Sequence, residues 1–139
     1  TIQLSSNRAL KGRTNLDDIF KLSSVVKEIN SNLPVVLMGY YNVILHYGIK
    51  NFVKKCTSCG VDGLIIVDLQ PEEDEDLVFE LKKKNIDLIR LITPTTDEKR
   101  LKLILKNATG FLYYVSIMGI TGQKSANIDD LSKSVNFVK

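Results

Sequence analysis

Four short apolar segments recur along the chain, and polar or amphipathic segments separate them. The apolar segments are Pro34–Met38, Leu64–Val67, Leu88–Ile92 and Phe111–Val115. They are mostly continuous rather than alternating, which is typical of strands that are covered on both faces. Because a helical pattern lies between each segment and the next, the sequence predicts repeated βαβ units and therefore a parallel sheet.

Helical spacing of apolar residues and terminal signals predict the intervening helices. Thr1 already lies inside one helical pattern. Acidic residues follow Pro71 at the start of one predicted helix, and lysines precede residue 85 at its end. This arrangement of charges complements the helix dipole. The other predicted helices are 16–29 with Asn15 as N-cap, 49–56 with Gly60 after its end, 71–84 with Pro71 in its first turn, one through 101–105 with Thr96 as N-cap, and one over about 127–138.

Polar residues follow each predicted strand, at residues 40–42, 68, 93–96 and 116–122. Barrel enzymes build their sites from such strand ends, and open sheets do so at their switch points. No G-x-G-x-x-G follows the first strand, which weakens a dinucleotide-binding interpretation. The glycines and Thr121 in the last of these turns could present N–H and hydroxyl groups to an anion. Arg90 interrupts the third strand and is expected to point into a polar layer near a barrel end.

Composition excludes several classes of protein. The 139 residues are 44% hydrophobic and 25% charged, as in an ordinary soluble globular protein. The net charge of +3 comes without a long basic run, so nucleic acid is not implied, and no apolar stretch is long enough to span a membrane. Cys56 and Cys59 have Cys-x-x-Cys spacing but close a helix, and His46 is the only histidine. Reduced thiols in an intracellular protein, without a metal, are the favoured interpretation.

Several blocks, taken together and in order, closely resemble the α chain of tryptophan synthase. The blocks are Leu37-Met38-Gly39-Tyr40-Tyr41-Asn42, Gly60 through Asp68 with Pro71-Glu72-Glu73, Pro94-Thr95-Thr96, and Gly110 through Ser116 with Gly119-Ile120-Thr121-Gly122. Thr1-Ile2-Gln3 and Arg8-Ala9-Leu10 also fit the segment after that family's second loop. The resemblance covers essentially the whole chain.

The resemblance implies an α/β fold, a (β/α)8 barrel of which this chain would supply strands three to six with flanking helices. Residues 1–139 would form a single incomplete barrel domain, cut at both ends. The implied reaction is retro-aldol cleavage of indole-3-glycerol phosphate to indole and glyceraldehyde 3-phosphate, a lyase step without cofactor or metal. Two carboxylates suit its proton transfers. The family's Glu and Asp would precede Thr1, so no catalytic residue is assigned and the chain alone is expected to be inactive.

The same resemblance assigns binding residues. Tyr113 would face the substrate, Thr121 would contact the catalytic Asp when its loop closes, and Gly122 would contribute to the phosphate end. Tyr40, Ile65 and Leu91 would line the indole pocket, although Tyr113, Ile65 and Leu91 could equally be plain barrel core. Tyr41 and Asn42 would approach the β chain of an α2β2 complex. Asp68 would orient loops rather than transfer protons.

Two departures and two alternatives accompany this interpretation. Gln70 and Val43 stand where the family usually has Pro, and the loss of Pro at position 43 is expected to loosen the third loop. The chain could instead belong to another phosphate-binding (β/α)8 biosynthetic enzyme, or be a non-catalytic α/β binding module. The resemblance implies a soluble protein of the plastid stroma or the bacterial cytoplasm.

Overall fold

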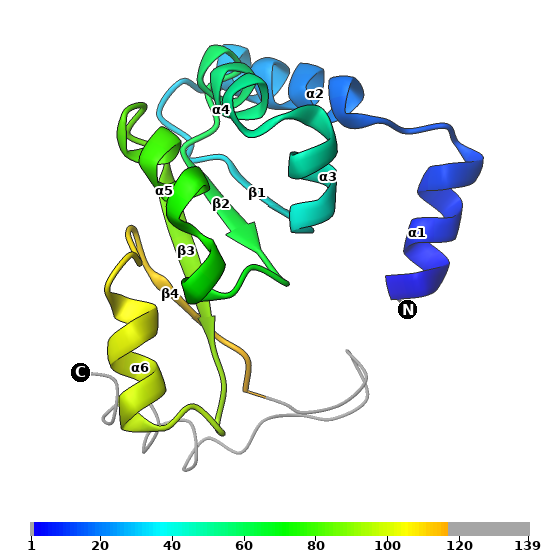
Figure 1. Cartoon of the computed structure of the whole chain (residues 1–139). Coiled ribbons are helices and arrows are strands. Elements are labelled where there is room, and N and C mark those ends of the chain that lie inside the picture. The colour runs from blue at the N-terminus through cyan, green and yellow to red at the C-terminus, as the bar shows by residue number, and fades with distance from the viewer. Residues whose placement is uncertain (1, 117–139) are drawn as a thin grey trace.

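The structure is a computed structural model that describes residues 2–116 (Figure 1). Helices and parallel strands alternate along most of this length. In chain order the elements are α1 (Ile2–Lys11), α2 (Leu16–Ile29), β1 (Val36–Gly39), α3 (Tyr41–Tyr47), α4 (Ile49–Ser58), β2 (Gly63–Ile66), a 3-10 turn η1 (Pro71–Glu73), α5 (Glu75–Lys82), β3 (Asp87–Ile92), α6 (Glu98–Leu105) and β4 (Leu112–Tyr114).

The four strands form one sheet in the order β1-β2-β3-β4, and every neighbouring pair is parallel. Sequential strands are therefore spatial neighbours, and at least one helix connects each to the next. The predicted parallel sheet with helical crossovers is confirmed. The strands begin within two residues of the predicted starts, a normal uncertainty for strand ends.

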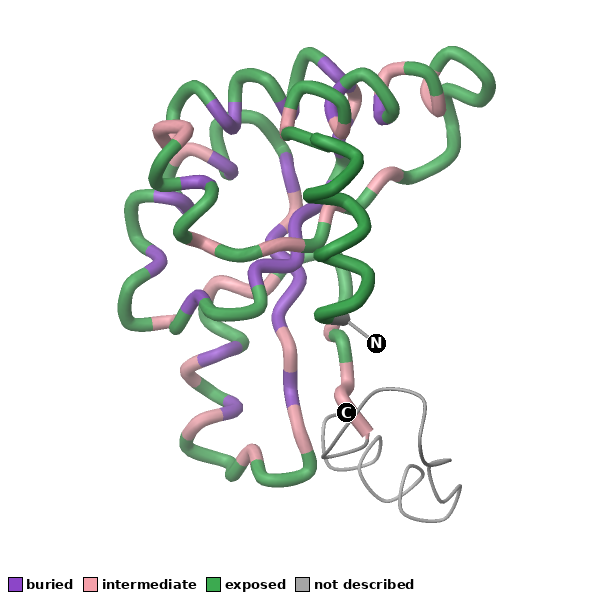
Figure 2. Tube along the Cα trace, turned by 90° about the vertical axis from the view of Figure 1, so that its right-hand side faces the viewer, coloured by how far each residue is buried: buried purple, intermediate pink, exposed green. Residues whose placement is uncertain are grey.

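The two faces of the sheet have different surroundings. Leu64, Ile66 and Leu88 belong to the main core cluster, together with side chains from α4 and α5. The side chains at the alternate positions point to the other side of the sheet, which we call the open face: Met38, Ile65, Ile89, Leu91 and Tyr113. The strand register places Met38 beside Ile65, Ile65 beside Ile89, and Leu91 beside Tyr113. Buried residues concentrate along the sheet and on the helix sides that cover it (Figure 2).

Burial on the open face falls away from its centre. Ile65 is 6% exposed and Ile89 2%, whereas Met38 is 59% exposed and Tyr113 42%. Gly63 makes room for this packing, because a Cβ at this position would lie 2.6 Å from Cδ1 of Ile89. The middle of the face is thus packed, while its outer positions present apolar surface.

Two of the predicted helix ends are confirmed. The side chain of Asn15 accepts a hydrogen bond from the backbone N of Asp18 at 3.2 Å, and the carboxylate of Asp18 accepts one from the backbone N of Asn15, so α2 starts with a capping box. Gly60 has a φ of 73° just after α4, the left-handed conformation that glycine adopts without steric cost.

Other predicted helix boundaries are wrong. Asp97, not Thr96, caps α6: its Oδ1 accepts from the backbone N of Arg100 at 2.7 Å, while Oγ1 of Thr96 accepts from the N of Thr93. Pro71 starts the separate turn η1, and α5 starts only at Glu75. The helix predicted over about 127–138 lies outside the described residues, as does Thr1.

The segment expected to be a loop after the first strand forms helix α3. Tyr40 is its N-cap residue but makes no side-chain capping bond; instead the Oδ1 of Asp68 accepts from the backbone N of Tyr41 at 2.7 Å. Ile44 anchors the helix in the core, and Gly48 ends it with a φ of 85°. Val43 therefore lies in the first turn of a helix rather than in a loosened loop.

At the amino ends of the strands, Asp62 ties α2 to the sheet. Its Oδ2 accepts from the backbone N of Val35 and from Nζ of Lys27, both at 2.7 Å. Partial burial opposes ionisation of the carboxyl, but the hydrogen bond and charge of Lys27 and the bond from Val35 outweigh it, so the pKa of Asp62 lies below its usual value.

We expect Asp62→Asn to lower stability at neutral pH by about 1 kcal/mol or less, since solvent screens a side chain that is 48% exposed. The pKa of Asp62 is lower in the folded state than its value of about 3.9 in the unfolded state. The ionised carboxyl therefore stabilises the fold fully above the unfolded-state pKa, and this stabilisation is lost as the pH falls through the folded-state pKa. Urea unfolding at pH 7 and pH 3 should show a smaller difference between variant and wild type at pH 3 than at pH 7. A difference that is as large at pH 3 would contradict this, and Asp76→Asn, on the exposed side of α5, is the control.

Candidate site at the carboxyl ends of the strands

Polar segments gather at one edge of the sheet because all four strands are parallel. Tyr40 follows β1, Asp68 follows β2, the threonines from Thr93 follow β3, and Ser116 follows β4. Asp68 links two of these strand ends through its bond to the backbone N of Tyr41. This contact agrees with the expectation that Asp68 orients loops.

Three predicted substrate-binding residues share the open face. Ile65 lies in β2, and Leu91 in β3 is paired with Tyr113 in β4, one layer nearer the carboxyl ends than Ile65 and Ile89. Ile65 is buried, Leu91 is half-buried and Tyr113 is 42% exposed. Ile65 is thus mainly a packing residue here, whereas Leu91 and Tyr113 offer surface that a ligand can contact.

The remaining predicted site residues fall in two groups. Tyr40 comes directly after β1 and is 51% exposed, so it is accessible at the same edge of the sheet. Thr121 and Gly122, assigned to the loop contact and the phosphate end, lie outside the described residues.

Tyr41 and Asn42, the predicted partner residues, differ in their surroundings. Tyr41 packs against the main core, and the pKa of its phenol is raised by burial and by the negative charges of Asp76 and Glu73. Asn42 is exposed and lines a groove with Asn15 and His46, between α2 and α3. Asn42 is therefore the more exposed of the two predicted partner residues.

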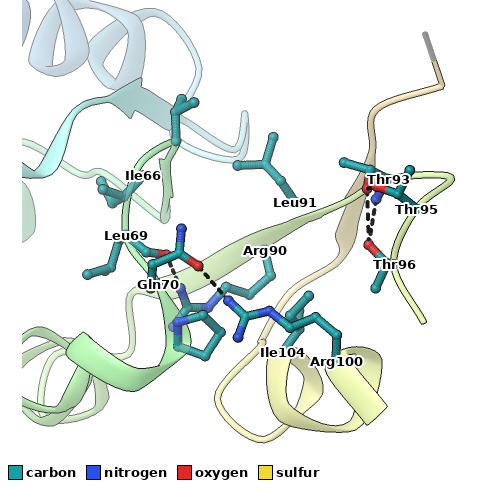
Figure 3. A pocket seen from close by; sticks show the side chains of 12 residues that line it. Ile66, Leu69, Gln70, Arg90, Leu91, Thr93, Thr95, Thr96, Arg100 and Ile104 are labelled. Carbon is teal, nitrogen blue, oxygen red and sulfur yellow. Dashed lines mark hydrogen bonds between the residues drawn. The ribbon is translucent and has the colours of Figure 1, made fainter. Parts of the chain in front are cut away.

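A polar cavity of about 290 Å³ lies between the carboxyl ends of β2 and β3 and the first turn of α6. Arg100 donates to Oε1 of Gln70 and pairs with Glu72, which fixes the loop after β2 to α6 (Figure 3). Sequence reasoning missed this contact, since thirty residues separate Gln70 from Arg100. In the sequence, Gln70 is notable only because the family usually has Pro at this position, and Pro has no side-chain hydrogen-bond acceptor.

Arg90 lies in a polar cluster, but on the helix side of the sheet rather than in a layer across a barrel end. Its Nη1 donates to the carbonyl oxygen of Leu69 at 3.0 Å, and its guanidinium forms an ion pair with Asp74. Both side chains are almost fully buried, and Asn107 donates to Oδ1 of Asp74 at 3.1 Å. Arg90 therefore joins β3 to the start of α5.

The two cysteines are buried free thiols. Burial raises the pKa of the Cys56 thiol to about 12, and Cys59 adds to the effect, so Cys56 stays protonated at neutral pH. As predicted, Cys56 faces the core from α4. Within residues 2–116 no group of three or more His, Cys, Asp or Glu side chains could hold a metal ion.

Parallel βα units in sequential order, with polar residues at the carboxyl ends of the strands, have the architecture of one part of a (β/α)8 barrel. A sequence profile described as "Tryptophan synthase alpha chain" matches residues 1–139. The chain belongs to the tryptophan synthase alpha chain family, as its sequence motifs predicted.

Solved structures of this family are similar to the chain over nearly all of its length. An alpha subunit from Campylobacter jejuni is 38% identical over 94% of this chain and 51% of its own, with a TM-score of 0.78. The tryptophan synthase a2b2 complex from Pyrococcus furiosus has a chain that is 33% identical, with coverages of 99% and 55% and a TM-score of 0.87. An alpha chain from Legionella pneumophila is 33% identical, with coverages of 98% and 49% and a TM-score of 0.85. The chain thus spans about half the length of these relatives. None of the described helices is long and apolar enough to cross a membrane.

Proposed function

We propose that the protein containing this chain is the alpha subunit of a tryptophan synthase. It would cleave indole-3-glycerol phosphate to indole and glyceraldehyde 3-phosphate during tryptophan biosynthesis. The observation that carries the proposal is the alignment of Leu91 and Tyr113 on the open face, at the carboxyl ends of parallel strands, in a member of this family.

In this proposal the chain supplies an apolar wall for the indole ring. Leu91 and Tyr113 would contact the ring, Tyr40 would approach it from the end of β1, and Ile65 would support the wall from beneath. A flat aromatic ring packs well against Tyr and Leu side chains, because the Leu side chain and the face of the Tyr ring both offer apolar area to it. Such a wall orients the substrate and excludes water from one side of it.

The chemical step needs a proton to reach the indole ring and another to leave a glycerol hydroxyl. The resemblance implies that the carboxylates for this step would precede Thr1, and the part of this chain would be to bind and position the substrate. Asp68 is the acidic residue nearest in sequence to the end of β2, but its Oδ1 is already bonded to the backbone N of Tyr41. We therefore assign Asp68 to holding α3 rather than to proton transfer.

The resemblance further supports roles for Thr121 and Gly122. Thr121 would contact the catalytic Asp when its loop closes, and Gly122 would approach the phosphate of the substrate. Both follow β4 in sequence, on the carboxyl side of the strand that carries Tyr113.

A β chain is the proposed protein partner. One similar structure is described as the tryptophan synthase a2b2 complex. Asn42 is exposed in the first turn of α3, beside the groove between α2 and α3. We infer that Asn42 contacts the partner directly and that Tyr41 holds α3 in place from the core side. The buried thiols Cys56 and Cys59 suit a reducing compartment, such as a bacterial cytoplasm or a plastid stroma.

The test is indole release from indole-3-glycerol phosphate by the protein as its gene encodes it. Enzymatic release of indole together with glyceraldehyde 3-phosphate is expected, without added metal or cofactor. A folded protein that binds the substrate without cleaving it would favour a binding module, and one that does neither would favour another barrel enzyme. Either result would overturn the proposal.

A further inference from the structure

The loop between β2 and η1, residues 67–70, holds the start of helix α3. Oδ1 of Asp68 accepts a hydrogen bond from the backbone N of Tyr41 at 2.7 Å. Tyr41 is the first residue of α3, and Tyr40, the N-cap residue, makes no side-chain capping bond of its own. The position of Tyr40 at the end of β1 therefore depends on where this loop places Asp68.

Two guanidinium groups hold the loop immediately after Asp68. Nη1 of Arg90 donates to the carbonyl oxygen of Leu69 at 3.0 Å, and Nη2 of Arg100 donates to Oε1 of Gln70. Figure 3 shows both bonds, which reach the loop from β3 and from α6. A side chain on α6 is thus bonded two residues away from the one that holds α3.

The two guanidinium groups differ in their surroundings. Arg90 is 4% exposed and forms the buried ion pair with Asp74, so it belongs to the packed interior. The side chain of Arg100 is 35% exposed and contacts Gln70 and Glu72 at the surface. An ion pair this exposed contributes little to folding stability. Arg100 can therefore be replaced in a folded protein, with its main effect on the position of the loop.

Helix α6 is a firm support for this contact. Leu101 and Ile104, on the turn next to Arg100, are buried against Ile92 of β3. The position of α6 is therefore fixed by apolar packing on the sheet, and Arg100 projects from a helix that is held independently of the loop. The bond from Arg100 to Gln70 accordingly places the loop relative to β3, the strand that carries Leu91.

We propose that Arg100 is a positioning residue for the substrate. Through Gln70 it holds the loop that carries Asp68, and Asp68 holds the start of α3 with Tyr40 beside it. This role rests on the proposed function, because Tyr40 matters only if it approaches the indole ring. Without the bond to Gln70, a smaller fraction of the molecules has Tyr40 in place, which weakens the apparent binding of the substrate by that fraction. Ground state and transition state are affected alike, so KM rises and kcat does not fall.

The first test is steady-state indole release by the protein as its gene encodes it, with Arg100→Met. Methionine keeps an aliphatic side chain but cannot donate to Gln70. KM for indole-3-glycerol phosphate should rise about three- to fivefold while kcat stays within about twofold, the scale of one partly exposed charged hydrogen bond. Lys102→Met is the control, since it removes a cation from the same helix, where it pairs with Glu98 at the surface, and should leave KM unchanged.

The backbone of Gln70 allows a rescue experiment. Its φ of −76° lies in the range that proline fixes, and within residues 2–116 its backbone N donates no hydrogen bond. Gln70→Pro should therefore stiffen the loop without strain and keep KM near that of wild type. In this background the loop no longer needs Arg100, so adding Arg100→Met should not raise KM. If Gln70→Pro does not fold, Gln70→Leu takes its place: it should raise KM as Arg100→Met does, and the double variant no further.

Unchanged KM in Arg100→Met would overturn the proposed role, and so would an equal rise in KM with and without the substitution at Gln70. A purely structural effect of Arg100 would lower the amount of folded protein, seen by circular dichroism, and with it the apparent kcat rather than raise KM. Absence of indole release by wild type would overturn the proposed function itself. Release by wild type with no change in Arg100→Met would overturn the positioning role alone.

Discussion

Replacing Arg90 by Met is expected to lower the free energy of unfolding by about 3–5 kcal/mol. The substitution keeps much of the side-chain volume but leaves the carboxylate of Asp74, which is 2% exposed, without its cation. It also removes the donor to the carbonyl oxygen of Leu69. An uncompensated charge in the interior is costly because neither water nor another cation can reach it. Urea unfolding of the whole protein, followed by far-UV circular dichroism, measures the change.

A second substitution separates the ion pair from simple packing. Adding Asp74→Leu to Arg90→Met removes the stranded carboxylate, and most of the lost stability should return. Lys102→Met is the control, since it breaks the exposed pair with Glu98 and should cost under about 0.5 kcal/mol. If Arg90→Met were no more destabilising than Lys102→Met, the buried pair would not stabilise the packing of α5 against β3.

Tyr113→Ala is expected to lower kcat/KM for indole-3-glycerol phosphate by about 10- to 100-fold, the effect of losing one aromatic contact with the substrate. Its effect on stability should be small, because Tyr113 is 42% exposed on the open face. The measurement is steady-state indole release together with urea unfolding of the same protein.

The adjacent residue provides the matched control. Tyr114 points to the other face of the sheet and packs against Ile92, Leu101 and Ile104 beneath α6. Tyr114→Ala should therefore lower the free energy of unfolding by about 2–3 kcal/mol while kcat/KM of the remaining folded protein stays near that of wild type. If the two variants exchanged these effects, the open face would not be the substrate-binding face.

The sheet could be predicted from sequence because its signals are local and strong. Leu64, Ile65 and Ile66 are all buried, since helices cover one face of β2 and neighbouring strand side chains pack on the other. A continuous apolar run is the pattern that such two-sided burial requires. The capping box at Asn15 and the left-handed Gly60 are equally local, because each depends on a few residues of the chain.

The missed features depend on contacts between distant residues. Helix α3 has seven residues and takes its cap from Asp68, twenty-seven positions away. Nothing near Tyr41 signals that contact. The split between η1 and α5 falls at Asp74, which is buried against Arg90 of β3. The error at Thr96 has a different cause: two adjacent residues can both cap a helix, and spacing alone does not choose between Thr96 and Asp97.

The candidate site was predictable in its position and only partly in its details. Parallel strands require that Leu91 and Tyr113 lie near the same edge of the sheet, and the register confirms that they are neighbours. Motif matching could not tell that Ile65 would be buried while Tyr113 stays accessible. Among the strands of residues 2–116, β2 has a partner on both sides and β4 has one on a single side, which accounts for the difference.

The most direct test of the account is a crystal structure of the whole protein soaked with indole, the proposed product. Indole should lie at the carboxyl ends of the strands, with its ring against Leu91 and Tyr113 on the open face. Indole bound only between the sheet and the helices, or a structure in which neighbouring strands run antiparallel, would contradict it.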